Sequence, residues 1–300
     1  MNITLAGGTG FLGRALANYF RSKGHEISIL TRKPKANNEI YWTGHYSDSW
    51  AEQIQETDIL INLSGKSVDC RYTSENKKLI IDSRINPTMA LHKAITEKKI
   101  RPKLWLNASS ATIYVHAETQ QMTETEGIIG DDFSMNVCKK WEAAFFSESH
   151  PDIRQVALRT SIVLGKDGGA FQKLKPLVIL AFGGKQGRGD QMVSWIHIKD
   201  FCRAVEFMIQ KEELHGRINV TSPHPIPNKD FMGVIRGVMN APFGISQPTW
   251  LLEMGAAMIG TETELLLKSR FVKPEILQNH DFKFEFPTIT DCIQDLCKSR

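Results

Sequence analysis

The chain has 300 residues, of which 41% are hydrophobic and 23% charged, and its formal net charge is +4. These values are typical of a soluble globular protein with ample material for a buried core. The positive charge is spread along the chain without a basic block rich in aromatic residues, and no apolar run approaches the roughly 20 residues that span a bilayer. We therefore expect neither a nucleic-acid partner nor a membrane partner.

The five cysteines are widely spaced and form no Cys-x-x-Cys pair. An odd number of cysteines without a disulfide or metal-binding pattern is typical of reduced thiols. The first residues lack the basic and apolar regions of a signal peptide. We therefore expect a cytoplasmic protein without a bound metal.

The first predicted element is a short strand over residues 3–6, which leads directly into GGTGFLG at residues 7–13 and then into a helical pattern. In a dinucleotide-binding turn the first glycine permits a tight turn, the second lets the backbone approach a pyrophosphate, and the third lets the helix pack on the strand. The helix then points its N-terminal amides at the anion. The expected cofactor contacts are Gly7, Thr9, Gly10, Phe11, Leu12 and Gly13.

A second strand over residues 26–30 completes a βαβ unit. An acidic residue just after this strand would bind a free ribose 2′-hydroxyl. The sequence instead has Thr31, Arg32 and Lys33 there, a hydroxyl followed by two cations. This set favours a 2′-phosphate and hence NADP(H) over NAD(H). A solvated basic loop without a ligand is the alternative.

The same alternation of strands and helices continues through the first half of the chain. It predicts an α/β fold with a Rossmann-type doubly wound parallel sheet. Further strands are expected over residues 58–63, 104–110 and 155–159, and helices over 49–55, 74–98 and 133–149.

After about residue 165, glycines and prolines interrupt this regular pattern. The change indicates a smaller C-terminal α/β substrate lobe. We expect residues 1–165 to form the NADP-binding Rossmann domain, with 190–222 returning to it, and residues 166–300 to form the substrate lobe.

Several motifs resemble those of extended short-chain dehydrogenases/reductases of the nucleoside-sugar epimerase type: GGTGFLG, LTR, NLSG, SSATIY and WIHIKD. Later strings, among them CKKWEAA, VLGKDGGAF and SRFVKPEIL, are similar to an atypical branch, the epimerase family with a distinctive C-terminal domain. The resemblance covers essentially the whole chain. It implies that further cofactor contacts come from Asn62, Leu63, Ser64, Gly65 and Arg84. The alternatives are that residues 62–65 are only the end of a strand and that Arg84 is a solvated arginine.

The sequence departs from the resembled family at the catalytic pair. Ordinary members have a serine after the fifth strand, where Ser110 stands here, and a Tyr-x-x-x-Lys on the next helix. In that pair the lysine lowers the pKa of the tyrosine, which then exchanges a proton with the substrate. Aligned through Trp141 and Glu142, the tyrosine and lysine positions hold Ser134 and Cys138. The usual acid–base pair is therefore missing.

Two side chains are candidates to replace this pair together with Ser110. Tyr114 lies four residues beyond Ser110, and the resemblance brings His197 to the substrate side. A packed aromatic and a core histidine are the alternative interpretations. Expected substrate contacts are Arg188 and Gln191, in and beside a glycine-rich loop that could equally be a simple hairpin, and Trp195.

Two functions are compatible with these residues. The first is an NADP(H)-dependent reductase or epimerase-like enzyme that acts on an unidentified small polar molecule. The second is an NADP(H)-binding sensor or interaction protein that has lost catalysis, which the missing Tyr-Lys pair favours. The glycine-rich loop and the aromatic-histidine strand after it favour a real substrate pocket. The substrate and the oligomeric state have no signal in the sequence.

Overall fold

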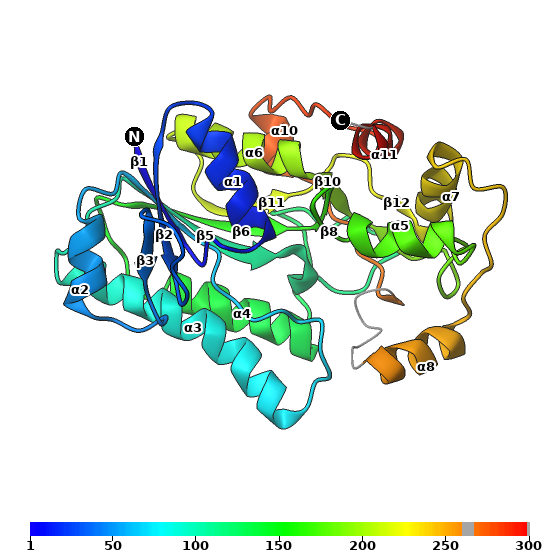
Figure 1. The fold of residues 1–300 in the computed structure, drawn as a ribbon, viewed down its shortest axis with the longest axis horizontal. Coiled ribbons are helices and arrows are strands. Elements are labelled where there is room, and N and C mark those ends of the chain that lie inside the picture. The colour runs from blue at the N-terminus through cyan, green and yellow to red at the C-terminus, as the bar shows by residue number, and fades with distance from the viewer. Residues whose placement is uncertain (260–266, 299–300) are drawn as a thin grey trace.

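A computed structural model describes residues 1–259 and 267–298 of the chain. A seven-stranded sheet with helices on both faces forms its larger part, and a smaller lobe lies beside this sheet (Figure 1). The strands follow the spatial order β3-β2-β1-β4-β5-β6-β11, and every neighbouring pair is parallel. They are β1 (Asn2–Ala6), β2 (Glu26–Thr31), β3 (Glu39–Tyr41), β4 (Ile59–Asn62), β5 (Leu104–Ser110), β6 (Arg154–Thr160) and β11 (Gly216–Val220).

Both faces of this sheet are buried, which explains the nearly continuous apolar runs in its strands. In β5, Leu104 and Leu106 pack into one core cluster, whereas Trp105 between them packs into the other. The strand order reverses between β1 and β4. In open α/β sheets, ligands bind in the crevice at the carboxyl ends of the strands near such a switch point.

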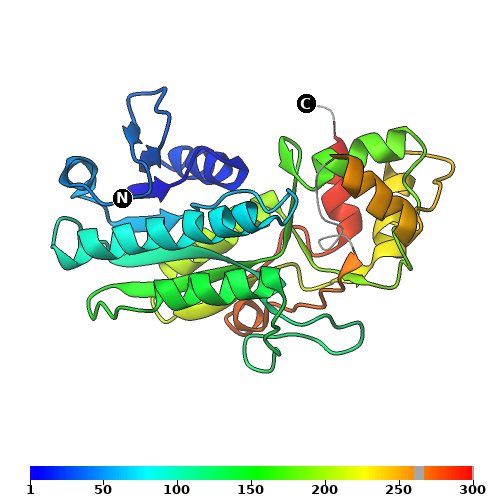
Figure 2. The same ribbon diagram turned by 90° about the horizontal axis from the view of Figure 1, so that it is seen from below.

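Two pairs of helices cover the faces of the sheet. On one face α1 (Phe11–Arg21) contacts α6 (Ile198–Gln210), and on the other α3 (Ser74–Thr96) contacts α4 (Phe133–Phe145) (Figures 1 and 2). Leu16 and Phe20 are four residues apart on α1, so both side chains lie on the face that packs against the sheet. The short helical segments of this part are α2 (Asp48–Ala51), η1 (Glu52–Ile54) and η2 (Ala111–Ile113).

The smaller lobe has its own core, in which Trp195, Phe231 and Ile293 are buried. Figure 2 shows its helices gathered at one end of the molecule. Its strands are β7 (Ile162–Gly165), β8 (Gly168–Gly169) and β10 (Trp195–His197) in one sheet and β9 (Met192–Val193) with β12 (Ile226–Pro227) in another. The helices of the second half, apart from α6, are α5 (Phe171–Ile179), α7 (Asn228–Val238), α8 (Thr249–Ile259), α10 (Glu275–Asn279) and α11 (Ile289–Cys297).

The predicted Rossmann-type doubly wound sheet is thus confirmed. The strand expected over 104–110 has these bounds, whereas the helix expected over 133–149 ends at Phe145. After Phe146, the polar residues 147–150 lead to Pro151, and the residue before a proline avoids the helical conformation. The chain returns from the lobe to the large sheet twice: α6 packs on the sheet and β11 is its edge strand, and later α10 contacts β11. Of the helices described, none has the length and apolar character needed to cross a membrane.

Candidate cofactor and substrate site

The turn between β1 and α1 is shaped by glycines. Gly7 has a φ of +72°, in the left-handed region that favours glycine. A Cβ added at Gly13 would lie 2.2 Å from the carbonyl oxygen of Gly8, so only glycine lets α1 pack this closely on the turn. At Gly10 the situation is the reverse, because an added Cβ would meet no described heavy atom within 4 Å. The backbone of Gly10 is therefore open to a ligand.

The N-terminus of α1 is suited to bind an anion. Within the described residues no side chain caps this helix, and its first turn contains no acidic residue. The first amides of a helix lack partners inside the helix and attract negative charge. These amides lie next to the open space at Gly10, so the residues present fit the pyrophosphate of a dinucleotide. The side chain of Phe11 packs on Gly165, Gly168 and Gly169, which leaves its backbone to face the turn.

The residues expected to bind the 2′-phosphate stand at the end of β2. Thr31 is buried and its Oγ1 accepts a hydrogen bond from the Lys33 amide at 3.3 Å. Arg32 is exposed, and no carboxylate in the described part of the chain pairs with it. A cation without an intramolecular partner is thus available at the position that reads the adenosine ribose.

The segment after β4 borders the glycine turn. Asn62 is buried and shapes this segment: its amide donates to Asn107 Oδ1 at 2.7 Å, and its Oδ1 accepts from the Ser64 amide at 3.1 Å. The Ser64 hydroxyl is buried and has no hydrogen-bond partner in the described structure. It lies 3.0 Å from where a Cβ of Gly7 would be. A buried polar group without a partner beside this turn is what a bound cofactor would satisfy. The backbone amide of Leu63 donates to the carbonyl oxygen of Ala6 at 2.8 Å.

Arg84 lies under the same segment. Its guanidinium donates to the carbonyl oxygens of Lys66 at 3.1 Å and Ile80 at 2.8 Å, and stacks 5.0 Å above the Trp141 ring. A Cβ at Gly65 would lie 3.2 Å from the Arg84 guanidinium carbon. Burial lowers the pKa of Arg84. Arg84 therefore joins α3, α4 and the loop at residues 65–66 where the cofactor is expected.

The two positions predicted to correspond to the Tyr-Lys pair are buried on α4. Ser134 is 6% exposed and Cys138 is 5% exposed. Burial raises the pKa of Cys138 to about 12, although the guanidinium groups of Arg84 and Arg270 oppose this rise. The thiol thus stays protonated at neutral pH and is neither a cation nor an activated nucleophile.

This state of Cys138 predicts a labelling pattern. We expect iodoacetamide at pH 8 to modify the partly exposed Cys70 in the native protein and to leave Cys138 unmodified until the protein unfolds, because alkylation requires an accessible thiolate. Peptide mass spectrometry of native and urea-unfolded samples measures both sites in one experiment. Modification of Cys138 as fast as Cys70 in the native protein would contradict the assignment.

Tyr114, predicted as a catalytic group, belongs instead to a buried polar network. Its hydroxyl donates to Asn219 Oδ1 at 2.9 Å and accepts from Arg159 Nη1 at 2.8 Å. The side chain is fully buried, and burial raises its pKa. A hydroxyl enclosed in this way cannot meet a substrate. The catalytic role predicted for Tyr114 is therefore corrected to a structural one. The neighbouring sequence could not show this, because both partners lie on strands more than 40 residues away in the chain.

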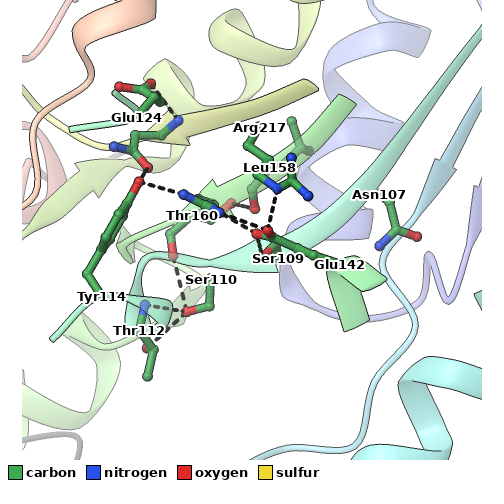
Figure 3. Close-up of polar contacts among 12 residues, drawn as sticks. Asn107, Ser109, Ser110, Thr112, Tyr114, Glu124, Glu142, Leu158, Thr160 and Arg217 are labelled. Carbon is green, nitrogen blue, oxygen red and sulfur yellow. Dashed lines mark hydrogen bonds and ion pairs between the residues drawn. The ribbon is translucent and has the colours of Figure 1, made fainter. Parts of the chain in front are cut away.

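The centre of this network is an ion pair between Arg159 on β6 and Glu142 on α4, and Figure 3 labels Glu142. Arg159 Nε and Nη2 each donate to the carboxylate at 2.8 Å. The same carboxylate accepts from Ser109 Oγ at 2.7 Å and from Arg217 Nε at 2.9 Å. At the far end, Glu124 Oε1 accepts from the Asn219 amide at 2.8 Å, and burial raises the pKa of Glu124 to about 7. The network ties α4 to β5, β6 and β11 and includes Ser109, the neighbour of Ser110 in the chain.

The expected roles of Trp195 and His197 are also corrected. Trp195 is fully buried in the core of the lobe, and its indole donates to the carbonyl oxygen of His224 at 3.2 Å. His197 is 1% exposed, caps α6 through its Nδ1, and stacks on Phe286 with ring centroids 3.9 Å apart. Burial lowers its pKa to about 4 although Asp295 opposes this. Both residues therefore hold the lobe together, and neither lines a described cavity.

Arg188 and Gln191, predicted as substrate contacts, line a cavity of about 570 Å³ between the glycine-rich loop and residues 116–120. Gln191 closes the loop on itself: its amide donates to Gln186 O at 2.7 Å, and its Oε1 accepts from the Gly189 amide at 2.9 Å. Arg188 is exposed and pairs with Glu118. The predicted substrate residues are therefore not gathered into the pocket that contains Ser110.

Ser110 lines a second cavity, of about 230 Å³, at the carboxyl ends of β5 and β6. Its Oγ lies 2.9 Å from Thr112 Oγ1 and 3.5 Å from the carbonyl oxygen of Thr160 (Figure 3). The lobe adds Lys268 and Arg270 to the same cavity. These two cations have no signal in the sequence, because a lysine and an arginine far along the chain from a serine form no distinctive motif. Only the fold brings them to Ser110.

One group of potential metal ligands occurs among the described residues, at His92, Glu148 and His150. His92 Nδ1 lies 2.8 Å from His150 Nε2. Nitrogen ligands of one zinc ion, each about 2.0–2.1 Å from the metal in a tetrahedral arrangement, are farther apart than this. The distance instead fits a hydrogen bond between two neutral rings, and burial lowers the pKa of both.

Comparison with known protein families identifies the family of this chain. The model of the NAD dependent epimerase/dehydratase family matches residues 3–221. The chain belongs to this family. A second model, described as a domain of unknown function (DUF1731), matches residues 247–296. In this epimerase/dehydratase chain the second model thus covers the segment that carries Lys268 and Arg270.

Relatives of the family cover the chain from end to end. The epimerase family protein YfhF of Bacillus subtilis is 29% identical over 100% of this chain and 99% of its own. An epimerase family protein of Staphylococcus aureus strain COL is 30% identical over 98% of each chain. The crystal structure of the human epimerase family protein SDR39U1 with NADPH is 28% identical, covers 99% of each chain and has a TM-score of 0.90. UDP-N-acetylglucosamine 4-epimerase from Bacillus cereus, at 16% identity and a TM-score of 0.76, shares the fold.

Proposed function

We propose that the chain binds NADP(H) and acts as a reductase or epimerase-like enzyme on a small polar substrate. The observation that carries the proposal is the open space over Gly10 beside the uncapped N-terminus of α1. Arg32 at the end of β2, where a carboxylate would select NAD(H), supports the phosphorylated cofactor. The similar human protein was solved with NADPH. With all five cysteines free, we also propose a reducing, cytoplasmic setting.

The residues would divide the binding as follows. The amides of α1 and the backbone of Gly10 would hold the pyrophosphate, and Arg32 would hold the 2′-phosphate. The Ser64 hydroxyl would gain the partner it lacks. When bound, the cofactor supplies or accepts a hydride. Ser110 and Thr112, whose hydroxyls lie 2.9 Å apart at the carboxyl end of β5, would orient a carbonyl or alcohol oxygen of the substrate.

A second candidate function is an NADP(H)-binding sensor or interaction protein. It is favoured by one observation: among the described residues that line the Ser110 cavity, none is a histidine, carboxylate, cysteine or tyrosine. General acid–base catalysis needs a group that titrates near the working pH. Oxidation of NADPH in the presence of a panel of small aldehydes and ketones, followed at 340 nm, separates the two functions.

The cofactor assignment predicts the effect of Arg32→Ala. A charge-assisted hydrogen bond is worth about 1.5–3 kcal/mol, so the variant should bind NADPH roughly 10- to 100-fold more weakly. NADH binding should be unchanged because NADH has no 2′-phosphate. The matched control is Arg21→Ala, an exposed arginine in the last turn of α1. Titration of nicotinamide fluorescence gives the affinities, and an equal loss for both cofactors would refute this role of Arg32.

A further inference from the structure

We propose that the outer end of the small lobe is the interface of a homodimer, in which a second copy of this chain covers an exposed apolar surface. The surface consists of residues 179–182 at the end of α5 and residues 243–254, which include the start of α8. We call it the lobe-end patch. The inference goes beyond the proposed function and does not rest on it, because it assigns a surface away from the expected cofactor contacts.

Exposed apolar side chains are concentrated in this patch. Among the described residues fourteen large apolar side chains are exposed, and seven of them belong to the lobe-end patch. Leu180 and Phe243 are 64% and 63% exposed. A side chain of this size has a surface of about 150–250 Å², so the seven together expose roughly 800 Å². The largest apolar patch on a typical monomer is only about 300–600 Å². An area of this size therefore indicates a partner.

The two segments of the patch form one continuous surface although they are far apart in the chain. The Ile245 amide donates to Ala181 O at 2.7 Å, and the Gly184 amide donates to Ile245 O at 3.2 Å. The Gln247 amide continues this pairing by donating to Lys185 O at 2.9 Å. Figure 1 shows the end of α5, the loop after α7 and α8 at the side of the lobe that is remote from the large sheet. The backbone bonds fix the arrangement of the two segments, which lowers the entropic cost of binding a partner.

The composition of α8 favours a protein partner over a lipid surface. Of its 11 residues, Glu253 is the only charged one. Trp250 and Met254 are both exposed, and their spacing of four residues places them on the same face of the helix. A helix that lies on a membrane surface has lysines and arginines on its polar face, and the sequence of α8 contains neither. Aromatic and methionine side chains without charges are instead typical of the centre of a protein interface.

The size and the charges of the patch fit a second copy of the chain. A standard interface buries about 800 Å² of each partner, which matches the area of the patch. With a two-fold axis between the two sides of the patch, the α5 side of one copy meets the α8 side of the other. The exposed cations Lys175 and Lys185 border the α5 side, and the exposed Glu253 borders the α8 side. Opposite charges therefore meet twice around an apolar centre.

Sedimentation velocity measures the association state that this interface predicts. The unmutated protein is analysed at concentrations from roughly 1 to 100 µM, a range in which interfaces of standard size associate. We expect a species with twice the monomer mass of 33.9 kDa, and its share should rise with concentration. A monomer throughout this range, or an open series of larger oligomers, would overturn the inference.

Two variants test whether the dimer forms through the lobe-end patch. Trp250→Glu and Leu180→Glu each place a charge in the apolar centre, and each should raise the Kd of the dimer about 30-fold or more. Both side chains are mostly exposed, so urea unfolding should give free energies close to that of the unmutated protein. The matched control is Leu79→Glu, an exposed leucine on α3, which should keep the Kd within about threefold. A dimer that survives both patch variants, or that dissociates in the control, would place the interface elsewhere and refute the inference.

Co-sedimentation with vesicles of phosphatidylserine and phosphatidylcholine tests the competing lipid partner. We expect no protein in the vesicle pellet. Pelleting that Trp250→Glu abolishes would assign the patch to a membrane surface and overturn the dimer. The proposed function has a separate test, because its failure would appear as an unmutated protein that does not bind NADPH. The sedimentation experiments would still decide the dimer in that case.

Discussion

Replacing Arg159 by methionine is expected to destabilise the protein by about 3–5 kcal/mol, the usual cost of removing one partner from a buried ion pair. Arg159 and Glu142 have side chains only 6% and 5% exposed, so the variant leaves a carboxylate in the interior without its main partner. Arg217 and Ser109 would remain, but Arg217 is half exposed. Urea unfolding followed by circular dichroism measures the change.

Two further variants make this result specific. Lys78→Met removes an exposed pair with Asp82 and should leave the unfolding free energy close to the unmutated value. The double variant Arg159→Met/Glu142→Leu should recover much of the loss, because it removes the unpaired charge as well. A loss below about 1 kcal/mol for Arg159→Met would show that the ion pair contributes little to the stability of the fold.

The same pair gives a pH dependence. Burial raises the pKa of Glu142, but the hydrogen bonds from Arg159 outweigh this and hold that pKa below its ordinary value of 4.5. A carboxyl group whose pKa is lowered on folding stabilises the protein fully above the unfolded pKa, and this stabilisation is lost as the pH falls through the lowered value. Between pH 5 and 3 the unmutated protein should therefore lose more stability than Arg159→Met.

The second large effect is expected for Gly10→Ala, which should weaken NADPH binding roughly 10- to 100-fold, the scale of a methyl group forced into a filled space. The added Cβ meets no described heavy atom in the protein alone, and the φ of Gly10, −74°, suits alanine. The unfolding free energy should therefore not fall. The clash arises only when a pyrophosphate occupies the open space.

Gly237→Ala on α7 is the matched control for this prediction, because a Cβ there also meets no described atom. It should change neither the NADPH affinity nor, by more than a small gain, the stability. Fluorescence titration and urea unfolding on both variants separate the two readouts. Unchanged NADPH affinity in Gly10→Ala would mean that the pyrophosphate does not pass over this glycine.

The parts of the site that could be predicted from the sequence are those built by neighbours in the chain. The strand, turn and helix over residues 2–21 follow from an apolar run, glycines at fixed spacing and helical periodicity, all of which are local. Gly13 is the clearest instance, since its close contact with Gly8 is what its position in the pattern implied. The parallel sheet followed for the same reason, from strands that alternate with helices.

The parts that could not be predicted depend on partners far away in the chain. Tyr114 follows Ser110 closely in sequence, but its hydroxyl is taken by Asn219 and Arg159. The ring of His197 stacks on Phe286, which is also far away in the chain. A sequence pattern does not distinguish a buried tyrosine or histidine from a catalytic one. Arg270 is the opposite case, a residue that no sequence pattern singles out but that the fold places at a cavity. Hydrogen bonds between its backbone and Met192 and Ser194 hold it there.

The measurement that tests the central claim most directly is a side-by-side calorimetric titration of the unmutated protein with NADPH and NADH. Arg32 and the open turn at Gly10 predict binding of both dinucleotides, with NADPH tighter by about 10-fold or more. Equal affinity for the two would contradict the role of Arg32. Binding of neither would contradict the assignment of this turn as a cofactor site.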